Sequence, residues 1–193
     1  MLCAVRAGPF GVRTVNRIVE EILAQRGVKT IAPALRPDRK LDPSGSFYDH
    51  RLILITVNDY SLDLYNGDVG VVLAEAPGKK SFYAWFSGQA AGGGDAYRKI
   101  AVNMLPAHET AFAMTVHKAH GSEFKRVLLV LTPEVQSPVL TRKLLYTGLT
   151  RTQEKIDLWC TEATFKAAVT RRTRRVSRLR TRLEEVVGSG GAT

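Results

Sequence analysis

The start of the chain carries a strand and a helix that cannot form a domain alone, and this constrains the fold more than any other feature. Residues 2–5 (LCAV) are a short apolar run before the turn signal Gly8-Pro9, as expected for a buried parallel strand. Apolar residues then recur at three- and four-residue spacing, predicting a helix that ends near Gly27: Val12, Val15, Ile18, Val19, Ile22 and Leu23. This pair must complete a sheet with later parts of the chain.

The second half of the chain returns to alternating strands and helices. Strands are predicted at residues 111–116, 127–131 (VLLVL) and 156–160, and helices at 141–152 and at 162–169, the last capped by Thr161. Together with the N-terminal pair, these elements predict one α/β domain with a shared sheet, split between residues 1–45 and 106–170. Three prolines between residues 31 and 45 predict an irregular connection out of its first part.

The middle of the chain, residues 46–105, has a different pattern. Short β-type runs at 51–57, 69–73, 81–86 and 98–102 are separated by Asn66-Gly67-Asp68, by Pro77-Gly78 and by the loop GQAAGGGD. This spacing predicts a small antiparallel barrel inserted into the α/β domain. Its aromatic residues, with lysines and arginines nearby, are candidates for stacking on exposed bases, although at least half of them must fill the core of so small a barrel.

The net charge of +10 is concentrated near the end of the chain. Seven of the 28 Lys and Arg residues lie in residues 171–182, which contain no Asp or Glu, so the remainder has 21 basic and 18 acidic residues. We therefore treat residues 171–193 as an Arg-rich tail. Such a tail can bind DNA through counterion release, contact an acidic protein, or remain solvated.

Composition also excludes several classes of protein. No window approaches the roughly 20 apolar residues that span a bilayer, and the first residues lack the pattern of a secretory signal, so we expect a cytoplasmic protein without membrane contact. Cys3 and Cys160, the only cysteines, lie in apolar runs and are predicted to be inert buried thiols. His117 and His120 have no third ligand of the expected type nearby, so no metal site is predicted.

A phosphate-binding loop of the form G-x-x-x-x-G-K-[ST] is absent from the sequence. The nearest approach, Gly78-Lys79-Lys80-Ser81, has strand-like flanks and predicts a hairpin turn. The sequence also lacks an acidic segment that would hold Mg²⁺ beside such a loop. We therefore expect that this chain alone does not hydrolyse a nucleoside triphosphate.

Two arginines are candidates for contact with a nucleotide held by another domain. Arg151 shares a helix face with Thr147, and a guanidinium there can stabilise the charge that develops on a terminal phosphate. Arg6 follows the first strand, at the edge of an α/β sheet where ligands usually bind. The alternatives are a surface arginine at a helix end and an ordinary basic residue after a strand.

Residues 115–123 combine short polar side chains with a glycine that permits a tight turn with positive φ. The polar members are Thr115, His117, Lys118, His120, Ser122 and Glu123, around Gly121. Such a turn exposes amides and hydroxyls that hydrogen-bond phosphodiester oxygens, which positions a nucleic-acid strand without reading its sequence.

Four segments resemble motifs of the RecD-type superfamily-one DNA helicases, which include the alpha subunit of exonuclease V and stand-alone relatives. They are LCAVRAGPFGVRTVN (motif IV), NDYSLDLYNGDVGVV (the barrel signature), AMTVHKAHGSEF (motif V) and LLYTGLTRT (motif VI). The resemblance is to the C-terminal part of these proteins and covers residues 2–160. His120 departs from the Gln or Lys usual in the family, and Thr152, Gln153 and Glu154 replace its small-then-basic run.

The resemblance implies a RecA-like (P-loop NTPase-type) second helicase domain with an inserted small SH3-like β-barrel. A first domain, absent from this sequence, would hold the phosphate loop and most contacts to ATP and Mg²⁺. The implied site residues fall into three groups. Arg6 and Arg151 would act as catalytic groups on the γ-phosphate, Gly121 and Glu123 would lie near the nucleotide, and Thr115, His117, Lys118, Ser122, Asn58 and Tyr60 would contact single-stranded DNA.

These implications predict the C-terminal portion of an ATP-dependent 5′ to 3′ DNA helicase that acts in recombination and double-strand break repair. Its expected partners are single-stranded DNA, the N-terminal helicase domain of the same protein and other exonuclease V subunits. Two alternatives remain open. One is a non-catalytic nucleic-acid-binding module that uses the barrel and the basic tail, and the other is a docking subunit whose motif segments serve only protein contacts.

Overall fold

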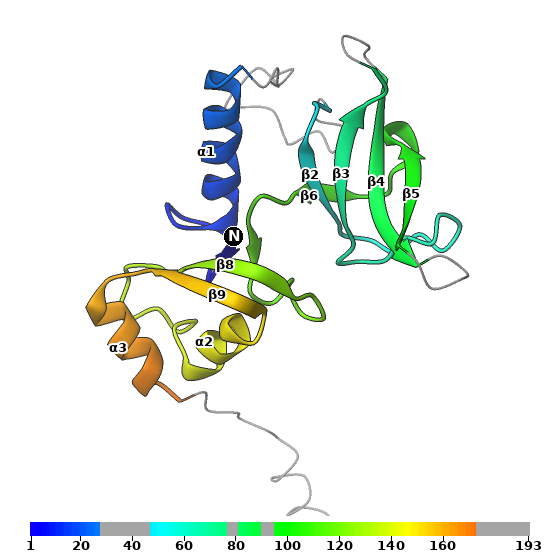
Figure 1. The fold of residues 1–193 in the computed structure, drawn as a ribbon. Coiled ribbons are helices and arrows are strands. Elements are labelled where there is room, and N and C mark those ends of the chain that lie inside the picture. Colours follow the sequence, from blue (N-terminus) through cyan, green and yellow to red (C-terminus); the bar gives the residue numbers. More distant parts are fainter. Residues whose placement is uncertain (28–46, 77–80, 90–94, 173–193) are drawn as a thin grey trace, which may run out of the picture.

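The computed structural model describes residues 1–27, 47–76, 81–89 and 95–172, which form two sheets and the helices beside them (Figure 1). The parallel sheet has the order β7-β1-β8-β9 and contains β1 (Leu2–Cys3), β7 (Met114–Thr115), β8 (Phe124–Val130) and β9 (Thr152–Trp159). The antiparallel sheet has the order β5-β4-β3-β2-β6 and contains β2 (Arg51–Ile55), β3 (Val69–Ala74), β4 (Phe82–Gln89), β5 (Asp95–Ala101) and β6 (His108–Thr110). The helices are α1 (Val12–Gln25), α2 (Arg142–Leu149), α3 (Glu162–Thr170) and the short 3-10 turn η1 (Val102–Met104).

Alternating side chains of the parallel sheet contribute to two separate clusters, because successive residues of a strand point to opposite faces. Leu2 and Leu129 belong to the largest buried cluster, with Leu144 and Leu145 of α2. Cys3 belongs to a smaller cluster that includes Val12 of α1. Accordingly, α1 rises from one side of this sheet while α2 and α3 lie on the other (Figure 1). The described part of the chain is therefore α/β with a parallel sheet, as predicted.

One face of the antiparallel sheet forms a separate hydrophobic core, and the other face packs against the parallel sheet. Ile53, Val72 and Phe86 are members of its own core. A Cβ on Gly70 would lie 2.6 Å from Cε1 of Phe86, so the packing of this ring requires glycine there. Leu54 is a member of the largest cluster instead, with its neighbours Leu52 and Val69 packed against that cluster. The two sheets thus share buried apolar surface.

Most predicted elements are observed, and the strand missed by the sequence analysis is β6. The strand predicted at residues 111–116 is reduced to β7, and β9 begins four residues before the predicted position 156. The helix predicted at residues 141–152 ends at Leu149, so Arg151 lies in the turn before β9, and the prediction that it shares a helix face with Thr147 is wrong. Strand β6 pairs with β2, with Glu109 opposite Leu54, so antiparallel pairing continues to Thr110, beyond Pro106. Gly27 has a positive φ of 78° directly after α1, and the hydroxyl of Thr161 accepts from the Thr164 amide at the start of α3, as the predicted end signals require.

Several sequence predictions fall outside the described residues. These are the irregular connection, the Gly78-Lys79-Lys80 turn, most of the glycine-rich loop and the tail from residue 173 onward. Among the helices that are described, none combines the length and apolar character needed to cross a membrane.

The two cysteines differ in exposure. Cys3 is fully buried in the parallel sheet, where burial raises the pKa of its thiol to about 11. Cys160 is only half-buried, and the same desolvation raises the pKa of its thiol as well. The prediction of two buried thiols is therefore correct for Cys3 and wrong in degree for Cys160, which lies just beyond the edge strand β9, where only one neighbouring strand covers the chain.

Candidate functional site

The connection between β7 and β8 forms a compact turn at residues 116–123, referred to below as the polar turn. The Lys118 amide donates to the Thr115 carbonyl at 3.0 Å and the Ala119 amide donates to the same oxygen at 3.2 Å. The Ser122 amide closes the turn on the Ala119 carbonyl at 3.1 Å, and Gly121 has a φ of 85°. The predicted tight turn with positive φ is confirmed.

The histidines of the polar turn both point to its surface side. His117 and His120 are exposed, their ring centroids lie 5.9 Å apart, and Nδ1 of His120 lies 2.7 Å from the carbonyl oxygen of His117. Within the ranges that the structure describes, no group of three or more His, Cys, Asp or Glu side chains is arranged to hold a metal ion. Both exposed imidazoles carry ring nitrogens that can form hydrogen bonds at the surface.

Arg151 lies at the end of α2 against the polar turn. Its Nη1 donates to the Ser122 carbonyl at 3.3 Å and its Nη2 to Oγ1 of Thr150 at 3.3 Å. The backbone fixes the same juxtaposition, since the Phe124 amide donates to the Arg151 carbonyl at 2.8 Å. Nε of Arg151 is buried and unpaired within the described residues. The guanidinium is thus oriented by the chain and retains further N–H donors.

Arg6 lies beyond β1 and contacts a carboxylate that the sequence analysis did not identify. Its Nη2 donates to Oε2 of Glu109 at 3.0 Å, and its side chain remains 57% exposed. The Nζ of Lys118, in the polar turn, donates to Oε1 of the same carboxylate at 2.7 Å. One carboxylate from the antiparallel sheet therefore links two cations of the α/β part.

Arg6 and Arg151 lie at opposite ends of the parallel sheet, so the structure does not bring together the two arginines that the resemblance assigns to one γ-phosphate. Arg6 follows the carboxyl end of β1, whereas Arg151 directly precedes Thr152 at the amino end of β9. The polar turn connects their surroundings, because Lys118 shares Glu109 with Arg6 while Ser122 binds Arg151. The polar turn therefore contacts the surroundings of both arginines.

The remaining predicted nucleotide and DNA residues divide between two places. Glu123 is exposed beside β9, where its Oε2 accepts from Nε2 of Gln153 at 3.1 Å. Asn58 lies in the β2–β3 connection, donating to Oη of Tyr60 at 3.2 Å and accepting from the Asn66 amide at 2.7 Å. Asn58 therefore orders its own turn, while Tyr60 remains 76% exposed on its surface.

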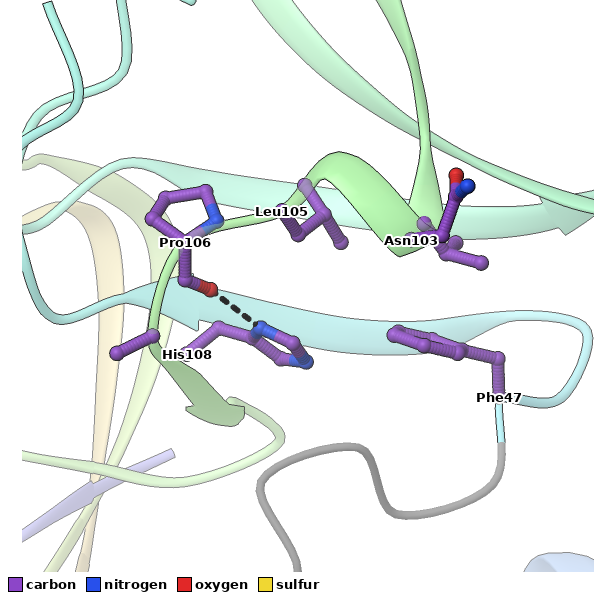
Figure 2. Close-up of a pocket in the computed structure, with 7 residues that line it drawn as sticks. Phe47, Asn103, Leu105, Pro106 and His108 are labelled. Carbon is purple, nitrogen blue, oxygen red and sulfur yellow. Dashed lines mark hydrogen bonds between the residues drawn. The ribbon is translucent and has the colours of Figure 1, made fainter.

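A pocket of about 540 Å³ lies at the end of the antiparallel sheet (Figure 2). It is lined by Phe47, Val102, Asn103, Leu105, Pro106, Ala107 and His108. The rings of Phe47 and His108 stack with centroids 5.5 Å apart, and Nδ1 of His108 lies 2.8 Å from the Pro106 carbonyl oxygen. Burial lowers the pKa of His108, so the imidazole is held neutral in this apolar wall.

Comparisons with known proteins agree with the motifs. Residues 110–158 match the UvrD-like helicase C-terminal domain. The RecBCD enzyme subunit RecD of Mycobacterium tuberculosis is 40% identical over 184 residues, which are 95% of this chain and 28% of that protein. The ATP-dependent RecD2 DNA helicase of Deinococcus radiodurans is 29% identical over 157 residues, covering 80% of this chain and 19% of that protein. The resemblance to RecD-type helicases is confirmed, and the chain spans less than a third of the length of either relative.

The crystal structure of Pif1 helicase from Bacteroides in complex with ADP-AlF3 and ssDNA covers 91% of this chain and 44% of its own, at 17% identity and a TM-score of 0.45.

Proposed function

We propose that this chain, which is similar over 95% of its length to a RecD helicase subunit, is the C-terminal portion of an ATP-dependent 5′ to 3′ DNA helicase of the RecD type. It serves recombination and double-strand break repair. Residues 1–45 and 106–170 form its RecA-like second motor domain, and residues 46–105 form the inserted SH3-like barrel, to whose sheet β6 (His108–Thr110) is added. The N-terminal motor domain of the same protein supplies the phosphate loop and holds most of ATP and Mg²⁺. Other exonuclease V subunits are further partners.

The placement of Arg151 against the polar turn carries this proposal. Two hydrogen bonds orient the guanidinium before any ligand arrives, so little side-chain freedom remains to be lost when it meets a phosphate. A preorganised cation of this kind stabilises negative charge that develops on the transferring phosphoryl group. Glu123 and Gly121 lie beside Arg151 in the same turn region, and Arg6, at the other end of the parallel sheet, is assigned to the nucleotide as a second guanidinium.

The DNA contacts are assigned to exposed or half-buried groups of β7, of the polar turn and of the β2–β3 connection. Thr115, His117, Lys118 and Ser122 present hydroxyl, imidazole and ammonium donors, which suit phosphodiester oxygens. Tyr60 presents an exposed ring on which a base can stack. These contacts position the strand independently of its sequence, as a motor that moves along DNA requires.

The test is the ATPase turnover of the full-length parent protein with saturating single-stranded DNA. Arg151→Ala is expected to lower kcat by about a thousandfold, because the finger stabilises the transition state. The affinity for single-stranded DNA changes little. Arg142→Ala is the matched control, since Arg142 lies at the other end of α2 and donates to the Val169 carbonyl. Turnover that is unchanged in Arg151→Ala contradicts the assigned role.

A second candidate, a nucleic-acid-binding module without nucleotide, is favoured by the seven arginines of residues 171–182. Binding of single-stranded DNA by this chain at two salt concentrations separates the two functions. Tight, salt-dependent binding that is lost when residues 171–182 are deleted, yet is unchanged by Tyr60→Ala, favours a simple polyanion-binding tail. The helicase proposal predicts measurable loss from Tyr60→Ala and from Lys118→Gln.

A further inference from the structure

Glu109 is the carboxylate that connects the antiparallel sheet to the two cations of the α/β part. Its Oε2 accepts from Arg6 at 3.0 Å and its Oε1 from Lys118 at 2.7 Å, so both oxygens are engaged. The side chains of Glu109 and Lys118 are each 28% exposed. Partial burial and a shared acceptor distinguish this trio from an isolated surface ion pair, which contributes little.

The backbone holds Glu109 in place from both sides. It stands opposite Leu54 in the β2–β6 ladder, and Leu54 is buried in the core of the parallel sheet. The next residue, Thr110, offers its carbonyl to Nδ2 of Asn16 at 2.8 Å, which ties β6 to α1. Glu109 is therefore a fixed point against which the two longer, more flexible cationic side chains are aligned.

We propose that Glu109 is a positioning residue through which single-stranded DNA bound at the polar turn alters the Arg6 guanidinium that meets the nucleotide. This inference rests on the proposed function. Arg6 and Lys118 repel each other, and the single carboxylate between them offsets that repulsion. When a DNA phosphate binds Lys118, the ammonium moves away from Oε1 of Glu109. The carboxylate then pairs with Arg6 alone and holds its guanidinium in position. The DNA stimulation of ATP hydrolysis passes in part through this shared carboxylate.

The proposal predicts a specific loss in the full-length parent protein. Glu109→Gln removes the charge and keeps the shape, so the ratio of ATPase turnover with saturating single-stranded DNA to turnover without DNA is expected to fall about tenfold, within the usual range of coupling between sites. Glu109→Asp keeps the charge and is expected to give an intermediate ratio. Glu162→Gln is the matched control, because Glu162 contacts one lysine, Lys166, at 2.6 Å on the exposed surface of α3.

A double-mutant cycle separates positioning from a merely structural effect. If Glu109 acts through Lys118, then Glu109→Gln added to Lys118→Gln lowers the ratio no further. Fully additive losses, or an unchanged ratio in Glu109→Gln and Glu109→Asp, overturn the proposal. An equal loss in Glu162→Gln overturns it too. Failure of the proposed function is recognised separately, by normal DNA-stimulated turnover in Arg151→Ala.

Discussion

The two sheets of this protein are assembled in opposite ways. The antiparallel sheet joins strands that are mostly consecutive in the chain, from β2 to β5, and adds β6 at its edge. In the parallel sheet, the two-residue strand β1 lies between β7 and β8. Its residue Leu2 pairs with Met114 and Leu129, which are more than a hundred residues away in the chain. The candidate phosphate and DNA groups lie at the ends of this non-local sheet, except for Asn58 and Tyr60 in the β2–β3 connection. The site therefore depends on the junction between the two sheets, where Leu54 of β2 is buried in the parallel-sheet core and Asn16 of α1 binds the Thr110 carbonyl of β6.

The largest expected effect on stability comes from replacing one large buried side chain in each core with alanine. Phe86→Ala in the antiparallel sheet is expected to cost about 4 kcal/mol of the free energy of unfolding, and Leu129→Ala in the parallel sheet about 3 kcal/mol, since both side chains are fully buried. Because Leu54, from β2, is buried in the parallel-sheet core, both changes should lower the stability of both sheets together. Urea titration measures the two free energies.

The chain contains two tryptophans, one in each sheet, and these report the sheets separately. Trp85 lies in β4 and Trp159 in β9. Fluorescence of single-tryptophan variants, Trp159→Phe and Trp85→Phe, should give one shared midpoint in urea, and Phe86→Ala should shift both readings equally. Two separated transitions in the unmutated background would contradict the view that the sheets form one cooperative unit.

A smaller effect is expected from breaking the polar connection at α1. The buried side chain of Asn16 donates to the carbonyls of Thr110 and Ala113 and accepts from the Ala113 amide at 2.7 Å. Asn16→Ala leaves these buried backbone groups unpaired, at a cost of about 2 kcal/mol. The Trp85 and Trp159 midpoints should then separate, because the change acts at the junction.

Arg17→Ala is the control for the junction, since Arg17 is the next residue of α1 and pairs on the surface with Glu21 at 2.7 Å. It should change the free energy of unfolding by no more than about 0.5 kcal/mol and leave both midpoints nearly unchanged. If Asn16→Ala behaves like Arg17→Ala, the hydrogen bonds of Asn16 do not hold the sheets together.

Sequence patterns predicted the elements well where the signal is local. The three- and four-residue spacing of apolar residues and Gly27 gave α1, and Thr161 marked the start of α3. A local signal for the junction also existed, since Asn16 lies four residues after Val12, on the apolar face of the helix. A polar residue there indicates a buried hydrogen-bonding partner, although the sequence does not say which.

The parts that the sequence analysis missed depend on pairing between distant segments. β6 has three residues, too few for alternation to reveal a strand, and it exists because β2 offers a free edge. Glu109 therefore had no visible partner, although it binds Arg6, which is 103 residues away. The separation of Arg6 and Arg151 to opposite ends of the parallel sheet follows from strand direction and register, which motif spacing does not encode.

The smallest expected effect concerns pH and a single titrating side chain of the antiparallel sheet. Burial lowers the pKa of His108 in the antiparallel sheet, so the unfolded chain binds a proton more readily than the folded chain. The sign follows from linkage: stability is greatest above the unfolded-state pKa of about 6.5 and falls as the pH drops below it. His108→Phe retains a ring against Phe47 and removes the titrating group. Thermal melting between pH 7.5 and 5 should therefore show a shallower loss in the variant, seen through Trp85, and an identical slope in the two proteins would show that His108 is not responsible.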